Sequence, residues 1–376
     1  MELEFTTDQD ELRDSIRAVL TKESPVALAR RVVDEGARPD ALWATVTSLG
    51  WPALTVPEVD GGVGLGMVEA GILAEEAGRV IAPGALVPTV TQFVPAVREV
   101  ATDDQRARFC GAVAAGECAG SLAIAEAHGS FDPAAVTATV TFEGDDALLA
   151  GEKRYVVEGD AVDELVVVAR EPGTSGDDGV RAVVVPVMSA QTRAVRALDS
   201  SRRFAHVNLD GVRVDRERVL GDGHTSSAAA LRRAIEESTV ATALEIVGTS
   251  QTIFDVTLDY AKQREQFGVP IGSFQAIKHK FADMIVSLER ARSTGYFAAL
   301  TIAEDDERRT TAASVAKAAA GDCQRLLSKE GIQIHGGIGY TWEHDMHLYV
   351  KRAKSLEPLF GSASTHRARI ADLLGV

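Results

Sequence analysis

The chain of 376 residues has few cysteines and no long apolar segment. Its three thiols, Cys110, Cys118 and Cys323, are odd in number and lack the spacing of metal ligands. We therefore expect reduced cysteines in a cytoplasmic protein. No run of 18 uncharged apolar residues occurs, which excludes an ordinary transmembrane helix. The first residues are acidic from Glu2 onward, which is not typical of a signal or transit peptide.

Basic residues are also scarce. The chain has 39 Lys and Arg against 55 Asp and Glu, a formal net charge of −16. Such a charge favours a soluble protein and argues against nucleic acid or an anionic membrane surface as a partner. It leaves a nucleotide-bearing ligand open, because a few arginines in one place are enough to bind a phosphate group. Internal repeats and low-complexity segments are absent.

The first part of the chain, residues 1–118, is predicted to be helical. Thr7 begins a segment that resembles a capping box. Leu12, Ile16 and Leu20 then fall on one face of a helix, and a further helix is expected to end at Gly50.

The pattern of apolar residues changes in residues 119–222. Short apolar or alternating runs at 135–142, 164–169 and 180–186 have the length of strands, and turn residues separate them. They predict a small antiparallel sandwich or barrel. Residues 223–376 return to long helical patterns. The fold class is therefore α+β and multidomain: an N-terminal helical domain, a middle antiparallel β domain and a C-terminal four-helix bundle.

Four separated stretches carry a resemblance to one family. They resemble, in the order that this family uses, segments of the acyl-CoA dehydrogenases, which are FAD-dependent. The stretches are PEVDGGVGLG at 57–66 with Ala74-Glu75-Glu76 after it, VRV at 212–214 with VLG at 219–221, REQFGVPIGSFQ at 264–275, and QIHGGIGY at 333–340.

The resemblance implies an FAD site. It assigns to the cofactor Arg264, Gln266, Phe267, Phe274, Gln275, Gln333, Gly337 and Ser362. In the family the segments at 264–275 and 333–337 reach the FAD of a neighbouring subunit, so the same resemblance implies an oligomer. Independently of the family, an arginine fork suits a pyrophosphate, although a lone arginine is more often a solvated surface residue. The pair Gly336-Gly337 permits close approach of a ligand, although such a pair more often only ends a helix.

The middle segment departs from the family pattern. Residues 125–132 stand where the family has a Thr-Glu-Pro loop rich in glycine, and Ser130 there is either a hydrogen-bonding partner of FAD or an exposed turn residue. Tyr155 replaces a tryptophan that flanks the flavin, and it can still stack on the ring. Val157 replaces a threonine whose hydroxyl faces the reactive nitrogen of the flavin, and valine cannot donate a hydrogen bond.

The catalytic base departs further. The family removes the proton α to a thioester with a carboxylate, which lies at one of two places. Those places are occupied here by Phe360 and Ser238. Among the nearby acids, Glu245 returns to nearly the same helical face about 10 Å along the helix, and Glu237 adjoins Ser238 but points elsewhere.

Glu245 has two possible roles. Its apolar neighbours indicate burial, and a buried, unpaired acid is a candidate for catalysis. The alternative is a structural acid paired with a basic residue such as Lys262 or Arg292. The histidine-containing run at 343–347 and His335 invite a metal site, but similar segments in the family bind no metal, and we expect none.

The sequence is compatible with three functions. The first is an acyl-CoA dehydrogenase that introduces an α,β double bond and passes electrons to an acceptor such as an electron-transfer flavoprotein. In the second, the chain lacks its own base and helps to bind FAD in a heterotetramer with a catalytically complete paralogue, rather than forming a homo-oligomer. The third is a flavin monooxygenase or oxidase on the same fold.

Overall fold

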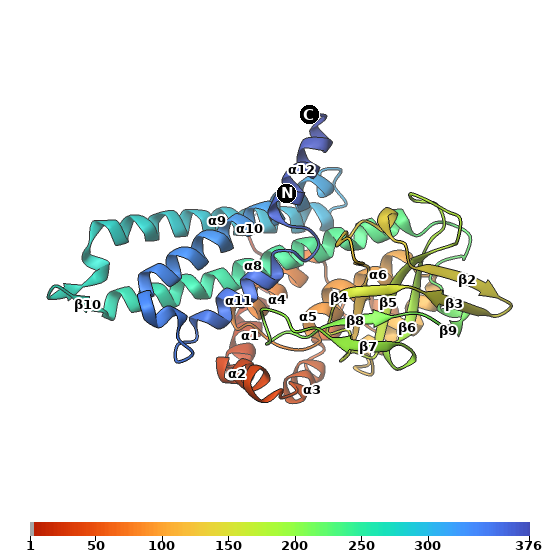
Figure 1. Ribbon diagram of the computed structural model, residues 1–376, viewed down its shortest axis with the longest axis horizontal. Coiled ribbons are helices and arrows are strands. Elements are labelled where there is room, and N and C mark those ends of the chain that lie inside the picture. Colours follow the sequence, from red (N-terminus) through yellow and green to blue (C-terminus); the bar gives the residue numbers. More distant parts are fainter. Residues whose placement is uncertain (1–3) are drawn as a thin grey trace. The chain divides into compact units, whose positions relative to one another are not determined.

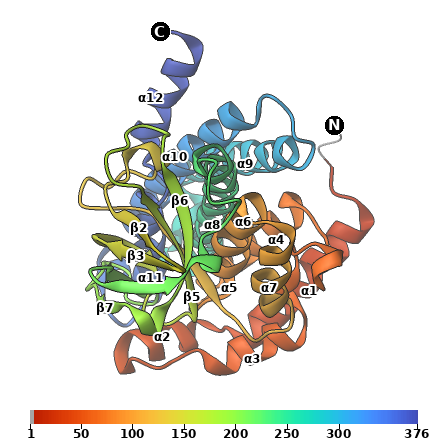
Figure 2. The same cartoon turned by 90° about the vertical axis from the view of Figure 1, so that its right-hand side faces the viewer.

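The structure is a computed structural model that describes residues 4–376. Figure 1 shows helices and strands along the chain, and Figure 2 shows them after a quarter turn. The chain forms two compact units, each built from separate segments. The helical unit comprises residues 4–37, 67–83 and 239–376, and the mixed unit comprises 38–66 and 84–238. None of the described helices is long and apolar enough to span a membrane.

The helical unit begins with a capped helix. Thr6, and not Thr7 as predicted, is the N-cap of the first helix: its hydroxyl accepts from the Gln9 amide, and the Gln9 side chain accepts from the Thr6 amide. The correction is one residue, because either threonine fits the sequence pattern. The elements of this unit are α1 (Thr7–Glu23), α2 (Val26–Glu35), α4 (Met67–Arg79), α8 (Ala228–Gln263, from Thr239 on), β10 (Glu265–Gln266), β11 (Val269–Pro270), α9 (Gln275–Ala303), α10 (Arg309–His335), α11 (Met346–Leu356) and α12 (Ala363–Leu374).

Helices α9 and α10 run side by side and make the most extensive helix contact of this unit (Figure 1). Apolar side chains from α8, α9, α10 and α11 fill one core, with Ile253, Met284, Leu327 and Met346 almost fully buried. Burial of each such side chain stabilises the fold by about 1.5–3 kcal/mol. These contacts make the C-terminal part helical, as predicted.

Two glycines bring α4 and α8 into backbone contact. A Cβ atom on Gly78 would lie 2.2 Å from the Glu245 carbonyl oxygen, and one on Gly248 would lie 1.8 Å from the Glu75 carbonyl oxygen. Only residues without a side chain fit at this crossing. The two helices are therefore locked in one register, which fixes where Glu75 and Glu245 point.

The mixed unit combines short helices with all the longer strands. Its helices are α3 (Asp40–Ser48), α5 (Leu86–Pro88), α6 (Val94–Val100), α7 (Asp103–Ala114) and the first turns of α8. Its strands are β1 (Gly120–Ala123), β2 (Thr139–Glu143), β3 (Asp146–Ala150), β4 (Glu152–Val157), β5 (Glu164–Arg170), β6 (Val180–Pro186), β7 (Gln191–Ala194), β8 (Phe204–Asn208) and β9 (Val212–Asp215). The predicted order of helical, β and helical segments is thus confirmed.

The strands form a six-stranded sheet, in the order β1-β5-β2-β3-β9 with β6 also on β5, and a three-stranded sheet β4-β8-β7. The larger sheet is mixed and not purely antiparallel as predicted, because β1 and β2 pair in parallel with β5. Long connections lead from these strands to β5, and such connections permit parallel pairing that short hairpins do not. The β5 and β6 segments lie almost wholly inside, which explains their unbroken apolar runs.

Candidate functional site

The ends of α8 and α10 come together in the helical unit. Tyr260, one turn before Arg264, stacks on His335 with ring centroids 4.4 Å apart, and His335 lies two residues after Gln333. The two segments assigned to FAD, at 264–275 and 333–337, therefore start from neighbouring helix ends. Sequence spacing alone does not reveal this contact.

The segment after α8 is an exposed hairpin. Phe267 and Gly268 both have positive φ and form the two-residue turn between β10 and β11. The Arg264 side chain is exposed, as are Gln266 and Gln275. Phe267 is 95% exposed and packs edge-on against Phe274, with ring centroids 6.3 Å apart. Large apolar rings and an arginine are thus displayed together on one surface hairpin.

The end of α10 is open in the same way. The helix ends at Gly336, whose φ of +63° favours glycine. Added Cβ atoms at Gly336 or Gly337 would meet no atom within 4 Å, and Gln333 is exposed. The backbone here is therefore accessible to a ligand.

In the mixed unit, a buried ion pair connects strand β4, which contains Tyr155, to the segment that leads into the loop with Ser130. Lys153 Nζ, fully buried, lies 2.6 Å from Glu126 Oε1, and the Arg154 amide donates to the Ala125 carbonyl. Burial alone would raise the pKa of the Glu126 carboxyl. Lys153 and the hydrogen bonds that Glu126 accepts outweigh this effect and lower the pKa to about 2. These two residues were not identified as functional from the sequence. A usable signal was the acid Glu126 directly after the apolar run of residues 122–125.

Tyr155 and Ser130 differ in how freely they are presented. Tyr155 sits at a break in the β4–β8 register, has a φ of +56°, is 50% exposed and packs edge-on against His206. Ser130 Oγ accepts from the Asp132 amide at 3.1 Å, as a turn serine does. Val157 is buried. The tyrosine ring is available for stacking, whereas the serine is already used locally.

The two base positions of the family contain no acid. Ser238 is buried, and its Oγ lies 2.7 Å from the Thr91 carbonyl oxygen and 3.0 Å from the Ala234 carbonyl oxygen. The adjacent Glu237 is buried and forms an ion pair with Arg98. Ser238 has no carboxylate, and the carboxylate of Glu237 is buried and paired, so neither side chain resembles an accessible catalytic base.

Glu245 is buried as expected, but it is not unpaired. Its Oε1 lies 3.4 Å from Nη1 of Arg352, which also donates to the Ala82 carbonyl at 3.2 Å. The partner is thus neither Lys262 nor Arg292. Lys262 is exposed near Asp259, and Arg292 pairs with Glu75. Arg352 comes from α11, 107 residues away, so local sequence patterns do not predict the pair.

The loop around Phe360 is held by two buried side chains. Lys317 Nζ donates to the carbonyls of Glu357 at 2.6 Å and Gly361 at 2.8 Å, and His366 Nε2 donates to the Phe360 carbonyl at 2.9 Å. Phe360 itself is buried with a φ of +56°, which is strained for a residue other than glycine. Burial lowers the pKa of Lys317 to about 7 and that of His366 to about 4.

Ser362 has a local task in this loop. It is the N-cap of α12, and its Oγ accepts from the Thr365 amide. The assignment of Ser362 to FAD therefore stays a prediction.

Family models match two parts of the chain. The model described as acyl-CoA dehydrogenase, N-terminal domain, matches residues 6–117, and the model described as acyl-CoA dehydrogenase, C-terminal domain, matches residues 228–375. The chain is 30% identical over 354 residues to acyl-CoA dehydrogenase IpdE2 of Mycobacterium tuberculosis, covering 93% of this chain and 92% of that protein.

Solved structures with similar folds include two above 25% identity. The glutaryl-coenzyme A dehydrogenase complex with glutaryl-CoA is 26% identical, with a TM-score of 0.90 over 100% of this chain and 97% of that one. The steroid ACAD Tcur3481-Tcur3483, a G363A variant, is 28% identical, with a TM-score of 0.85 over 98% of both chains.

Proposed function

This chain belongs to the acyl-CoA dehydrogenase family, a family of oxidoreductases, and we propose that it binds FAD and takes part in introducing an α,β double bond into an acyl-CoA thioester. The observation that carries the proposal is the meeting of the α8 and α10 ends through Tyr260 and His335, with both flanking segments exposed. An exposed arginine, open glycine backbone and aromatic rings together fit a dinucleotide.

The residues of this chain have distinct tasks in the proposal. Arg264 would pair with the pyrophosphate through its fork of N–H groups. Gly336 and Gly337 would allow the backbone to approach the cofactor. Tyr155 would stack on the flavin ring, and Val157 leaves the ring without a side-chain hydrogen bond at that position. Bound FAD supplies the acceptor for the hydride that leaves the β carbon.

The neighbour of this site is proposed to be another subunit. Phe267, Tyr340 and Trp342 are 95%, 76% and 54% exposed. Aromatic side chains are enriched at protein interfaces, so their exposure supports contact with another chain. In the proposed assembly, the hairpin of one chain covers the FAD of the next, either in a homo-oligomer or with a paralogue.

One observation favours a second candidate, in which this chain does not supply the base. Glu237 and Glu245 are both buried and paired with arginines, and Ser238 and Phe360 replace the usual acids. The chain would then complete an FAD site in a heterotetramer whose other subunit abstracts the α proton. The similar steroid ACAD has the double name Tcur3481-Tcur3483, which supports a paired arrangement.

The test is anaerobic mixing of the FAD-loaded protein with a panel of acyl-CoA thioesters, followed by flavin absorbance. Dehydrogenation bleaches the flavin at its long-wavelength band. Bleaching by the chain alone supports the first candidate. Bleaching only after addition of a homologue with a carboxylate at the position of Ser238 or Phe360 supports the second. Absence of bleaching in both arms, across the panel, would contradict the proposed reaction.

The electron acceptor is tested after reduction. We propose an electron-transfer flavoprotein, which should reoxidise the reduced flavin faster than dissolved oxygen does. Rapid reaction with oxygen would instead indicate a monooxygenase or oxidase.

A further inference from the structure

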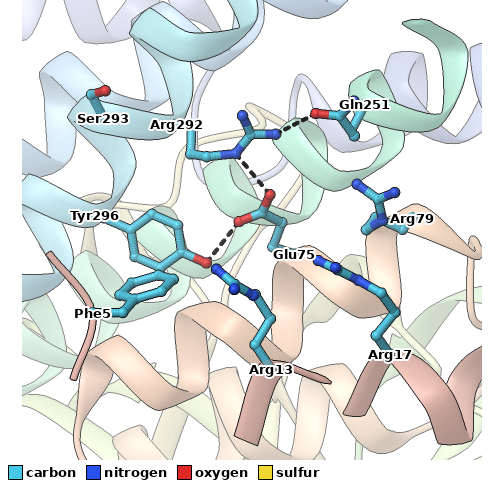
Figure 3. Close-up of a pocket in the computed structure, with 9 residues that line it drawn as sticks. All are labelled: Phe5, Arg13, Arg17, Glu75, Arg79, Gln251, Arg292, Ser293 and Tyr296. Carbon is cyan, nitrogen blue, oxygen red and sulfur yellow. Dashed lines mark hydrogen bonds and ion pairs between the residues drawn. The ribbon is translucent and has the colours of Figure 1, made fainter. Parts of the chain in front are cut away.

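The helical unit contains a cavity lined by a cluster of arginines, and this cavity has no part in the proposed FAD site. The cavity has a volume of about 500 Å3. Figure 3 shows four arginines around it, Arg13 and Arg17 from α1, Arg79 from α4 and Arg292 from α9. Among the lining residues that the structure describes, Glu75 is the only one with a carboxylate. The lining is therefore richer in cationic side chains than the chain as a whole, which has a net charge of −16.

Glu75 holds one side of the cavity in place. Its Oε1 accepts from Arg292 Nε at 3.0 Å, and its Oε2 accepts from the Tyr296 hydroxyl at 2.7 Å (Figure 3). Arg292 Nη2 also donates to Gln251 at 2.6 Å. Burial, together with the neighbouring Glu75 carboxylate, raises the pKa of Tyr296 well above its usual value, so the hydroxyl stays a donor. The Arg292 guanidinium is thus fixed before any ligand arrives.

Glu76 holds the other side. Its buried carboxylate accepts from Arg17 Nε at 2.9 Å and from Arg17 Nη2 at 2.7 Å, and it lies 3.7 Å from Arg79 Nε. It is not among the lining residues, so it holds the two arginines without occupying the cavity wall. Fixed guanidinium groups lose little conformational entropy when they bind an anion.

The arginines also form ion pairs with exposed acids outside the cavity lining. Asp14, 70% exposed, pairs with Arg13 and Arg17, and Glu289, 53% exposed, pairs with Arg292. Arg13 pairs with Asp10, and Arg79 with Asp255, whose side chains are 50% and 44% exposed. Exposed ion pairs contribute about 0–1 kcal/mol each and are readily exchanged. Arg13 Nε is shielded from solvent and lies 3.8 Å from the Asp14 carboxylate, but it makes no hydrogen bond to the residues that the structure describes. A bound anion would provide one.

We propose that this cavity binds a small organic molecule that carries a phosphate or pyrophosphate group. Guanidinium groups from three helices approach from different sides, which suits the several acceptor oxygens of a phosphate better than one planar carboxylate. Phe5 and Tyr296, packed edge-on with centroids 4.7 Å apart, form an apolar wall beside the arginines for the organic part. The volume is that of an ordinary small-molecule site.

The test measures binding of inorganic pyrophosphate to the FAD-loaded, assembled protein by titration calorimetry, with citrate as a polycarboxylate comparison. Arg13→Gln removes a lining charge and leaves the buried Glu75 and Glu76 paired. Arg13→Gln/Arg79→Gln removes two. Arg213→Gln is the matched control, because this exposed arginine of β9 lies in the mixed unit and its loss changes the net charge equally.

Pyrophosphate should bind saturably and more tightly than citrate. Arg13→Gln should weaken it by roughly tenfold, the double variant by more, and Arg213→Gln should leave it unchanged. Lack of saturable binding by the wild-type protein would overturn the proposal, as would equal affinity for citrate or unchanged binding in a correctly folded Arg13→Gln protein. Because the flavin stays bound throughout, the result is independent of the proposed dehydrogenation.

Discussion

At the scale of single residues, the loop around Phe360 depends on His366. This imidazole lies in a buried site beside Lys317, donates to the Phe360 carbonyl, and is also near the positive charge of Arg369. Burial and the two cations oppose a second proton on the ring, which is why its pKa falls to about 4. The unfolded chain takes up this proton near pH 6.5.

A pH dependence follows from that difference. The stabilising contribution of the neutral His366 is complete above pH 6.5 and is lost as the pH falls towards 4, by up to about 3 kcal/mol. His366→Gln can keep the donor to Phe360 without titrating. Urea unfolding at pH 7 and pH 5 should show a smaller loss of stability for the variant than for the wild type. Equal losses in both proteins would disprove the role of His366.

Glu245 has two possible roles, and its contacts support the structural one. Its pairing with the fully buried Arg352 indicates a structural part. Glu245→Gln leaves a buried guanidinium without its counter-charge and should lower the free energy of unfolding by roughly 3–5 kcal/mol. A double variant with Arg352→Gln should lose less than the sum of the single changes. If stability were instead unchanged while flavin reduction fell by about 10², Glu245 would be the base after all.

At the scale of elements, the crossing of α4 and α8 is the tightest contact that we can test. Gly248→Ala places a methyl group 1.8 Å from the Glu75 carbonyl oxygen, so the helices must separate. Overpacking of this kind costs about 1–3 kcal/mol or more, measurable by urea unfolding. Gly111→Ala in α7 is the matched control, because its nearest contact is an ordinary 3.6 Å, and alanine there should be neutral or slightly stabilising. Equal effects at the two positions would refute the close approach.

Among the elements, some features can be predicted from the sequence and others cannot. Strand β6 and the helix face of Ile16 and Leu20 follow from local apolar patterns, because each pattern matches one period and one buried face. The parallel pairing of β1 with β5 and the Arg352–Glu245 pair depend on segments far apart in the chain. Local patterns contain no information about such partners. The residues assigned to FAD could be predicted from the family resemblance. The arginine-lined cavity could not be predicted, because its residues come from four elements that are far apart in the sequence.

At the scale of the whole molecule, the exposed aromatic residues predict an assembly. We expect a dimer or a dimer of dimers by multi-angle light scattering, because Phe267 and Tyr340 would otherwise remain in water. Phe267→Ser should shift the protein towards smaller species and weaken FAD retention together. A wild-type monomer that nevertheless holds FAD tightly would rule out a cofactor site shared between subunits.

The most direct measurement is the affinity for FAD of three proteins: wild type, Arg264→Ala, and Arg213→Ala as the control for loss of an exposed arginine. Loss of a charged hydrogen-bond partner typically costs about 1.5–3 kcal/mol, or roughly ten- to a hundredfold in affinity. Titration of the apoprotein, followed by flavin fluorescence, should show wild type and Arg213→Ala binding equally and Arg264→Ala binding at least about tenfold more weakly. Equal affinity in all three correctly folded and assembled proteins would show that the exposed end of α8 does not hold the cofactor.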